Sequence, residues 1–155
     1  MQAAAAEKQI AHRAQAVRAQ DFRAALDRAL EIADADERIG PLIAATRLRL
    51  CLRFPDADLV LYIAAGVDGA NIRWSFGEVE WRPKLELTMD SVTANRYLQG
   101  RESLAIAIAH GQARHRGESR SVLVGLPAAR LLCEPYREAI RSEFPQLADR
   151  PLDSA

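Results

Sequence analysis

The stretch from residue 85 to residue 117 constrains the fold of this chain more than any other. It starts with LELTM, in which apolar and polar side chains alternate, as is typical of a strand with one solvated face. Two segments with helical composition follow, over residues 91–99 and 104–110, and each runs into a glycine. A short polar strand then leads to Gly117. This order predicts an oily helix held between glycines beside a sheet, which is a way to build an apolar pocket.

The ends of these two helices are marked by capping residues. Asp90 and Ser103 are suited to accept hydrogen bonds from the first free N–H groups, and Gly100 and Gly111 suit the left-handed position after a helix. The second helix is apolar nearly all round, so we expect it to be buried on more than one side.

Strands are also predicted before this stretch. Residues 46–54 alternate strictly, and residues 59–65 do the same after a turn at Pro55. Asp68-Gly69 predicts a tight hairpin, because both residues tolerate positive φ. The pattern continues as a strand over 71–81 with a break at Gly77, and again over 84–89. In the first of these strands one face is expected to carry Leu48, Leu50, Leu52 and Phe54 and the other Arg47, Arg49, Cys51 and Arg53.

Helices are predicted at both ends of the chain. Residues 3–35 contain neither Gly nor Pro, and their apolar positions recur at helical spacing, with Asp21 as a cap for a second segment. Gly40-Pro41 is expected to end this region. Near the C-terminus we predict helices over 119–126, with Pro127 starting a new turn, and over 136–144. The apolar stripe of the first helices consists of Ile10, Ala14, Val17, Phe22, Leu26, Leu30 and Ala33.

Composition excludes several classes of protein. The 155 residues are enough for one ordinary domain, and 49% of them are hydrophobic, which excludes a disordered chain. Lys and Arg number 21, as do Asp and Glu, so a general nucleic-acid binder is not expected. No apolar run is long enough to span a bilayer or to form a signal peptide. Cys51 and Cys133 have no metal-binding spacing, and we expect buried thiols in the cytoplasm, with a bridge left open.

The order of elements resembles that of the sterol carrier protein family, the non-specific lipid-transfer domains. Their pattern is a strand ending in LTM, a cap, a helix closing at Gly, a short Ala-rich helix, Gly, a strand, Gly, and a closing helix with Leu and Pro. The likeness covers about residues 48–136. It rests on Leu85, Leu87, Thr88, Met89, Asp90, Gly100, Leu104, Ala105, Ala107, Gly111, Gly117, Leu123, Leu126 and Pro127.

This resemblance implies a fold and a domain division. We expect an α+β domain over residues 41–145, with a mixed, mostly antiparallel five-stranded sheet covered on one face by helices. A helical extension over 1–40 precedes it, and a tail over 146–155 follows. The resemblance also implies a hydrophobic cavity for fatty acyl chains, sterols or other lipids, roofed by the helix over 104–110 and the closing helix.

The candidate ligand-binding residues are mostly apolar, and each alone is typical of an ordinary core. Beside a helix flanked by glycines they form a set suited to line a cavity. Leu104 and Leu126 are placed in it by the resemblance, since these helices close the family's cavities. The set consists of Trp74, Phe76, Leu87, Met89, Tyr97, Leu104, Ile108, His115, Leu123 and Leu126.

His115 is the polar member of the set. It occupies a position where the family's strand usually turns an apolar residue inward. A neutral core imidazole, an exposed ring, a hydrogen bond to a ligand's polar head and a general base are all open. His110 and His115 straddle Gly111 without a third ligand, so no metal is expected, and the sequence carries no motif for another cofactor.

Three functions follow, in order of preference. The first is non-covalent binding of a lipid or other hydrophobic small molecule, with no catalytic residue. Contact with a membrane is at most peripheral, because Arg114, Arg116 and Arg120 are too few for stable anchoring. The second is an accessory module that dimerises, or docks on a partner enzyme, through the sheet and the N-terminal helices. The third is a small isomerase or cyclase with His115 as base.

Overall fold

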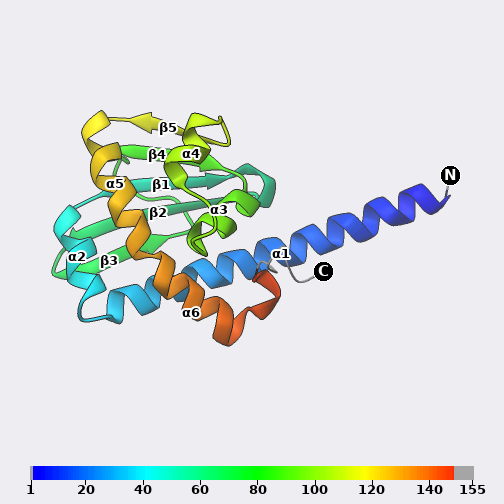
Figure 1. Ribbon diagram of the computed structural model, residues 1–155, viewed down its shortest axis with the longest axis horizontal. Helices are drawn as coiled ribbons and strands as arrows, with labels where there is room; N and C mark the ends of the chain where they lie inside the picture. The colour runs from blue at the N-terminus through cyan, green and yellow to red at the C-terminus, as the bar shows by residue number, and fades with distance from the viewer. Residues whose placement is uncertain (1, 149–155) are drawn as a thin grey trace.

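The structure, a computed structural model, describes residues 2–148, and of the side chains it describes Ala5 and those of residues 18–148. Two helices come first, four strands follow, and a pair of helices then precedes and another pair follows the fifth strand (Figure 1). The helices are α1 (Gln2–Ala35), α2 (Ile39–Thr46), α3 (Ser91–Leu98), α4 (Leu104–Ala109), α5 (Ser119–Leu131) and α6 (Cys133–Glu143). The strands are β1 (Arg49–Phe54), β2 (Leu59–Val67), β3 (Ala70–Ser75), β4 (Leu85–Met89) and β5 (Ala113–Gly117).

The strands form one five-stranded sheet in the order β3-β2-β1-β4-β5. Only β1 and β4 run parallel, whereas β1–β2, β2–β3 and β4–β5 are antiparallel. The central pair is joined by the register Leu50 opposite Leu85 and Leu52 opposite Leu87. The expected fold class, an α+β domain with a mixed and mostly antiparallel five-stranded sheet, is confirmed.

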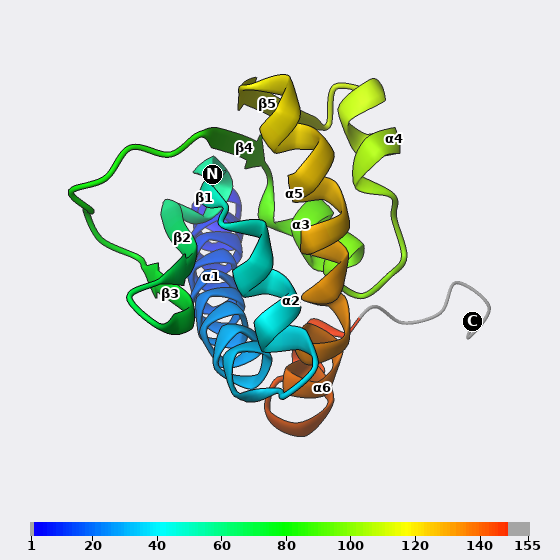
Figure 2. The same ribbon diagram turned by 90° about the vertical axis from the view of Figure 1, so that its left-hand side faces the viewer.

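The helices gather on one face of the sheet. Figure 2 shows α2, α3 and α5 on one side of the strands and the segment that joins β3 to β4 on the other. On that other face Trp81 meets Tyr62 edge to face, with ring centroids 5.8 Å apart. Arg53 also forms an ion pair there with Glu86, at 3.1 Å. The face under the helices therefore holds the main core, as the alternation in β1 predicts.

Short-range sequence signals place the predicted turns and caps. Asp68 and Gly69 both have positive φ, 49° and 78°, and Val67 pairs with Ala70, so they form a two-residue hairpin turn. The Asp90 carboxylate accepts a hydrogen bond from the Thr93 N–H at 2.7 Å and so caps α3. Ser103 caps α4 in the same way, through its hydroxyl and the Ile106 N–H.

Three predictions for residues 71–127 are wrong. The strand expected over 71–81 ends at Ser75, and residues 76–84 form the connection to β4. Helix α4 is buried on one side only, because Leu104 and Ala107 face the core while Ile106 is 54% exposed. Pro127 lies inside α5 and does not begin a new helix.

The N-terminal region also differs from the expectation. Residues 2–35 form one continuous helix, without a second start at Asp21, and Ile10, Ala14 and Val17 lie outside the described side chains. Gly40-Pro41 lies in the first turn of α2, where a proline is tolerated, and not at the end of a helix. The Asp36 carboxylate accepts hydrogen bonds from the backbone N–H groups of Ile39 and Arg38, which hold its pKa below the usual range.

The domain boundaries at residues 40 and 146 stay predictions. On either side of them, however, side chains join the core of the sheet. Phe22, Leu26 and Leu30 of α1 are at most 4% exposed. Leu147 is buried as well, and its carbonyl accepts a hydrogen bond from the Asn95 amide at 2.9 Å.

The two cysteines are not bridged. Cys51 and Cys133 are both free thiols, and burial raises the pKa of each. Within residues 2–148, no helix has both the length and the apolar character needed to cross a membrane.

Candidate ligand-binding cavity

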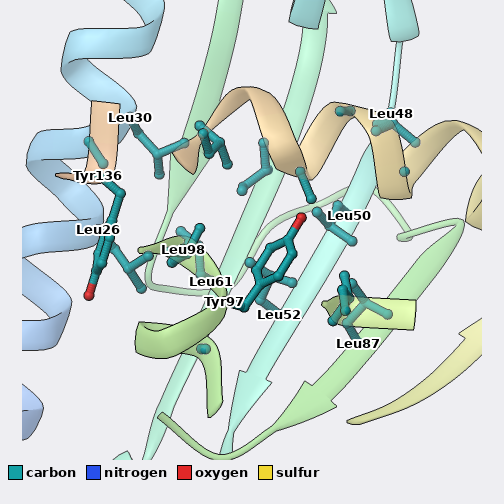
Figure 3. Close-up of a pocket in the computed structure, with 18 of the residues that line it drawn as sticks. Leu26, Leu30, Leu48, Leu50, Leu52, Leu61, Leu87, Tyr97, Leu98 and Tyr136 are labelled. Carbon is teal, nitrogen blue, oxygen red and sulfur yellow. The ribbon is translucent and has the colours of Figure 1, made fainter. Parts of the chain in front are cut away.

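A cavity of about 70 Å³ lies between the sheet and the helices that cover it. Its lining is almost wholly apolar, as Figure 3 shows, and none of the side chains that line it carries a formal charge at neutral pH. The lining residues come from five helices of the covering layer, from α6 and from four of the strands. They include Leu26 and Leu30 of α1, Leu50, Leu52 and Phe54 of β1, Leu61 and Ile63 of β2, Leu87 and Met89 of β4, Tyr97 and Leu98 of α3, Leu104 of α4, Gly125 and Ala128 of α5, and Tyr136 of α6.

Small side chains on α5 explain why the interior is hollow here. The buried positions of α5 are Ser121, Gly125 and Ala128, which recur at helical spacing and turn one face toward the sheet. Of these, Gly125 and Ala128 line the cavity, and each carries at most one side-chain carbon, so α5 adds few atoms to the lining. A methyl group at Gly125 would lie 2.9 Å from Cδ2 of Leu85, which shows that α5 approaches the sheet closely at this point.

Tyr97 places a polar atom in this apolar space. Its side chain is 8% exposed, and its ring stands among the leucines with the oxygen directed toward α5 (Figure 3). Within the described part of the chain, its hydroxyl is the one buried side-chain oxygen or nitrogen that has no hydrogen-bond partner. Such a group costs about 1–3 kcal/mol relative to a paired one. Because of this cost, core packing alone does not explain why a tyrosine occupies this position.

The other tyrosine of the lining is satisfied. Tyr136 is fully buried, and its hydroxyl donates a hydrogen bond of 2.6 Å to the Asn95 side chain. Its ring meets Phe22 edge to face at 6.5 Å, and Phe22 meets Phe54 in the same way at 5.0 Å. Aromatic rings therefore fill the interior on the side of α1 and α6.

A larger groove of about 550 Å³ opens to solvent beside the cavity. It runs between the segment that leads into α4 and the middle of α5, and it is lined by Gly100, Ser103, Leu126, Pro127 and Cys133 together with the charged residues Arg101, Glu102 and Arg130. Tyr97 and Leu104 line both the groove and the cavity, so these two side chains form the wall between them.

The comparisons with known proteins agree with this architecture. No protein-family model matches the chain, and no curated protein is similar to it. Among solved structures, the crystal structure of sterol carrier protein 2 superposes with a TM-score of 0.51 at 19% identity, covering 74% of this chain and 95% of the other. A ubiquinone synthesis protein, UbiJ-SCP2, gives a TM-score of 0.51 at 13% identity, covering 66% and 82%.

This chain has the sterol carrier protein 2 fold. The fold that the resemblance in the sequence implied is confirmed by these structures. A third match is the stereoselective inverting sec-alkylsulfatase Pisa1 from a Pseudomonas species, at 13% identity with a TM-score of 0.47. It covers 56% of this chain, and the chain spans only 14% of that enzyme's length.

The structure brings part of the predicted set together in this sterol carrier fold. Leu87, Met89, Tyr97 and Leu104 line the cavity, and Leu126 lines the groove. Ile108 is half-buried and packs at the edge of the core, whereas Leu123 is 75% exposed and points away from it. That the lining residues bind a ligand stays a prediction.

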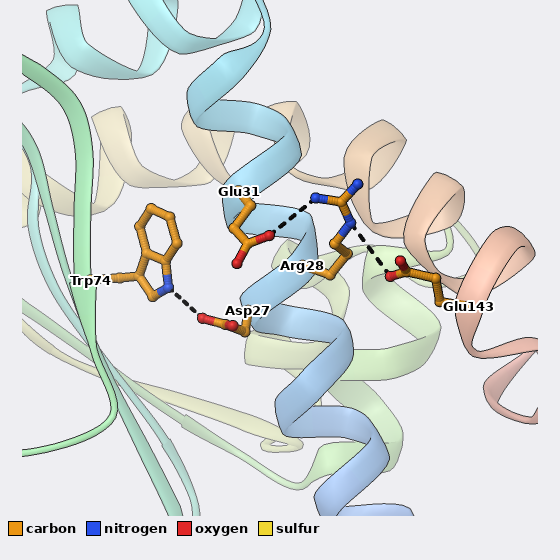
Figure 4. Close-up of polar contacts among 5 residues, drawn as sticks. All are labelled: Asp27, Arg28, Glu31, Trp74 and Glu143. Atoms are coloured by element: carbon orange, nitrogen blue, oxygen red, sulfur yellow. Dashed lines mark hydrogen bonds and ion pairs between the residues drawn. The ribbon is translucent and has the colours of Figure 1, made fainter.

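Trp74 and Phe76 lie elsewhere, against α1. The indole N–H of Trp74 donates a hydrogen bond of 2.8 Å to Asp27, as Figure 4 shows, and the Arg23 guanidinium sits 4.8 Å from the centre of the Phe76 ring. Arg28, which follows Asp27 in α1, forms ion pairs with Glu31 at 3.0 Å and with Glu143 of α6 at 3.4 Å. These contacts tie α1 to β3 and α6, so Trp74 and Phe76 serve packing and line neither cavity nor groove.

His115 does not face the cavity. It pairs with Leu87 in the register of β5 and β4, which puts it on the inner face, but β5 is an edge strand and the side chain is exposed. It lines neither the cavity nor the groove. Among the described side chains of residues 18–148, no group of three or more His, Cys, Asp or Glu is placed to hold a metal ion.

Sequence reasoning missed the most important part of the lining. The small residues Gly125 and Ala128 of α5 were overlooked in favour of the larger Leu123 and Leu126. The signal is present in the sequence, because Ser121, Gly125 and Ala128 are spaced as i, i+4 and i+7. The apolar patterns of α1 and β1 indicate that their leucines are buried. That these leucines line a common cavity depends on the tertiary fold, which no local pattern shows.

Proposed function

We propose that this protein binds a hydrophobic small molecule or lipid non-covalently in the cavity beneath α5. The observation that carries the proposal is an apolar hollow separated from an open groove by only two side chains, Tyr97 and Leu104. Apolar pockets of this kind, with few polar groups, are typical of small-molecule sites. The sterol carrier protein 2 fold supports the same proposal by analogy.

The two spaces have different parts in this proposal. A cavity of about 70 Å³ admits only a short apolar segment, so a longer ligand continues into the groove of about 550 Å³. Tyr97 and Leu104 have to move aside for the two spaces to join. The segment that carries Leu104 lies between two glycines, Gly100 with φ of 78° and Gly111 with φ of 74°. Neither glycine has a side chain of its own to restrict the backbone.

Burial of hydrocarbon supplies the binding energy. Each methylene taken out of water contributes about 0.8 kcal/mol. A chain of about six methylenes therefore contributes roughly 5 kcal/mol, which corresponds to a Kd somewhat below 1 mM before other terms are counted. Micromolar affinity then requires that the rest of the ligand be covered by the groove.

Native mass spectrometry of the purified protein, followed by organic extraction, tests the proposal. We expect an adduct of defined mass that is released by the solvent and that raises the melting temperature when added back. Absence of any adduct, together with no thermal shift across a panel of alkanes, ketones, alcohols and fatty acids, would contradict it.

A second candidate, an interaction module, is favoured by the shape of α1. In Figure 1 the first half of this helix projects well beyond the sheet, whereas its second half lies along the domain. An isolated helical arm gains most of its stability only when it packs on another surface. We infer that residues 2–17 are the segment through which a second copy or a partner would dock.

Truncation of the arm tests this second candidate. The cut belongs before residue 18, because Phe22, Leu26 and Leu30 are core residues whose loss would unfold the domain. If the candidate is right, the full chain elutes from size exclusion at about twice the mass of a monomer, or captures a partner, and the shortened chain does not. If both chains elute at the mass of a monomer, the homodimer hypothesis is contradicted.

A further inference from the structure

We propose that the ligand carries an uncharged oxygen, such as a ketone, aldehyde, ester or alcohol oxygen, and that the Tyr97 hydroxyl donates a hydrogen bond to it inside the cavity. This inference rests on the proposed function and narrows it to one chemical class. It assigns to Tyr97 a polar contact that selects among hydrophobic molecules of the same size.

The first argument is the position of the hydroxyl. Tyr97 is more than nine-tenths buried, and its oxygen is directed among the cavity-lining side chains and toward α5 (Figure 3). It has no partner within the described residues, unlike Tyr136, whose hydroxyl is bonded to Asn95. A buried polar atom that the protein leaves unpaired is expected to find its partner in a ligand or a solvent molecule.

Water is a poor partner at this point. A buried water molecule typically makes about three hydrogen bonds, and the surfaces around the cavity offer it essentially one. A molecule with a single oxygen and an apolar body matches the site better, because it pairs with the hydroxyl and buries hydrocarbon against the leucines at the same time.

The absence of charge in the lining argues for a neutral oxygen. None of the described side chains that line the cavity is cationic, and an unpaired carboxylate in such surroundings is strongly disfavoured. The charged groups of the site, Arg101, Glu102 and Arg130, line the groove on the other side of Tyr97. A carboxylate would therefore stay in the groove and leave the hydroxyl unpaired.

The state of the phenol agrees with a donor role. Burial raises the pKa of Tyr97, with the Cys133 side chain adding to the effect, so the hydroxyl keeps its proton throughout the physiological range. It is therefore able to donate to a carbonyl, ether or hydroxyl oxygen.

A matched set of probes tests the inference. Methyl hexyl ketone is compared with its methylene analogue, in which =CH₂ replaces the carbonyl oxygen, and with heptanoate, which has the same hexyl chain. Affinities are measured by calorimetry or NMR for the wild type, for Tyr97→Phe, and for Tyr62→Phe, which makes the same chemical change on the opposite face of the sheet.

The decisive quantity is the affinity ratio of the ketone to its methylene analogue. Because one hydrogen bond is worth a factor of about three to ten, we expect Tyr97→Phe to lower this ratio by that factor and Tyr62→Phe to leave it unchanged. Heptanoate should bind the wild type more weakly than the ketone. The carbonyl stretch of the bound ketone should also lie at lower frequency in the wild type than in Tyr97→Phe.

The other outcomes separate this inference from the proposed function. If both uncharged probes bind and the ratio is the same in the wild type and Tyr97→Phe, the role of the hydroxyl is overturned while the cavity stands. Tighter binding of heptanoate than of the ketone would overturn the uncharged class. If neither uncharged probe binds, the inference and the cavity proposal both fail.

Discussion

Two regions of one interior differ in how they are filled. On the side of α1 and α6, Phe54 and Tyr136 form the cavity wall, the Phe22 ring behind them meets both rings edge to face, and the Tyr136 hydroxyl is bonded to Asn95. Under α5, the small residues Gly125 and Ala128 line the cavity, and the Tyr97 hydroxyl has no partner among the described residues. We refer to these as the filled region and the hollow region.

The difference shows how one domain divides its tasks. Cores packed to the density of crystals supply stability, and any atom missing from them is costly. The hollow region gives up part of that stability, both in lost contacts and in one unpaired hydroxyl. Such a loss is expected where an element serves binding, so the contrast itself points to the hollow region as the functional one.

The largest expected difference is the response to added volume. Ala25 on α1 is fully buried and does not line the cavity, whereas Ala128 does line it. We expect Ala25→Leu to lower the free energy of unfolding by about 1–3 kcal/mol, because it overpacks a filled region. Ala128→Leu should change it by less than about 1 kcal/mol, since the new atoms enter empty space. Urea denaturation of both variants measures the difference, and equal losses would break the comparison.

Removing one hydroxyl from each region gives the next largest effect. Tyr136→Phe removes the hydrogen bond that the hydroxyl donates to Oδ1 of Asn95, and it should lower the free energy of unfolding by about 1–2 kcal/mol. Tyr97→Phe removes a buried group that has no partner, so the free energy should stay the same or rise by up to about 1 kcal/mol. A loss in Tyr97→Phe as large as that in Tyr136→Phe would show that the Tyr97 hydroxyl is paired in solution.

The smallest predicted effect is a dependence on high pH. Burial raises the pKa of Tyr97 in the folded state, whereas in the unfolded state it is about 10. The folded protein therefore holds a proton that the unfolded chain releases, and stability falls as the pH rises through 10. The tyrosine's share is about 0.4 kcal/mol at pH 10 and grows above it. Urea denaturation at several alkaline pH values should show a weaker dependence in Tyr97→Phe than in the wild type, and identical curves would contradict the assignment.

The sequence predicted the fold better than the site. The alternation over residues 49–54, the Asp68-Gly69 turn and the caps at Asp90 and Ser103 are local signals, and the structure bears each of them out. Residues 46–48, also predicted as strand, lie outside β1, and Thr46 ends α2. The end of β3 at Ser75 and the exposed side of α4 depend on which surfaces later elements cover, so no local pattern shows them.

The site was harder for the same reason. A cavity arises where side chains are missing. A pattern of large apolar residues therefore indicates Leu123, which is exposed, and omits Gly125 and Ala128, which line the cavity. The sequence places Tyr97 in the candidate ligand-binding set together with mostly apolar side chains. Its unpaired hydroxyl follows from the absence of any neighbouring partner, which only three-dimensional structure reveals.

The central claim is that the hollow region takes up an apolar molecule, and titration of the methylene analogue followed by backbone amide NMR tests it most directly. In the wild type we predict saturable shifts at Leu87, Tyr97 and Gly125, which surround the cavity. In Ala128→Leu, with the fold retained, these shifts should be lost because the added side chain occupies the space. Shifts that persist unchanged in Ala128→Leu, or that are absent from the wild type, would contradict the account.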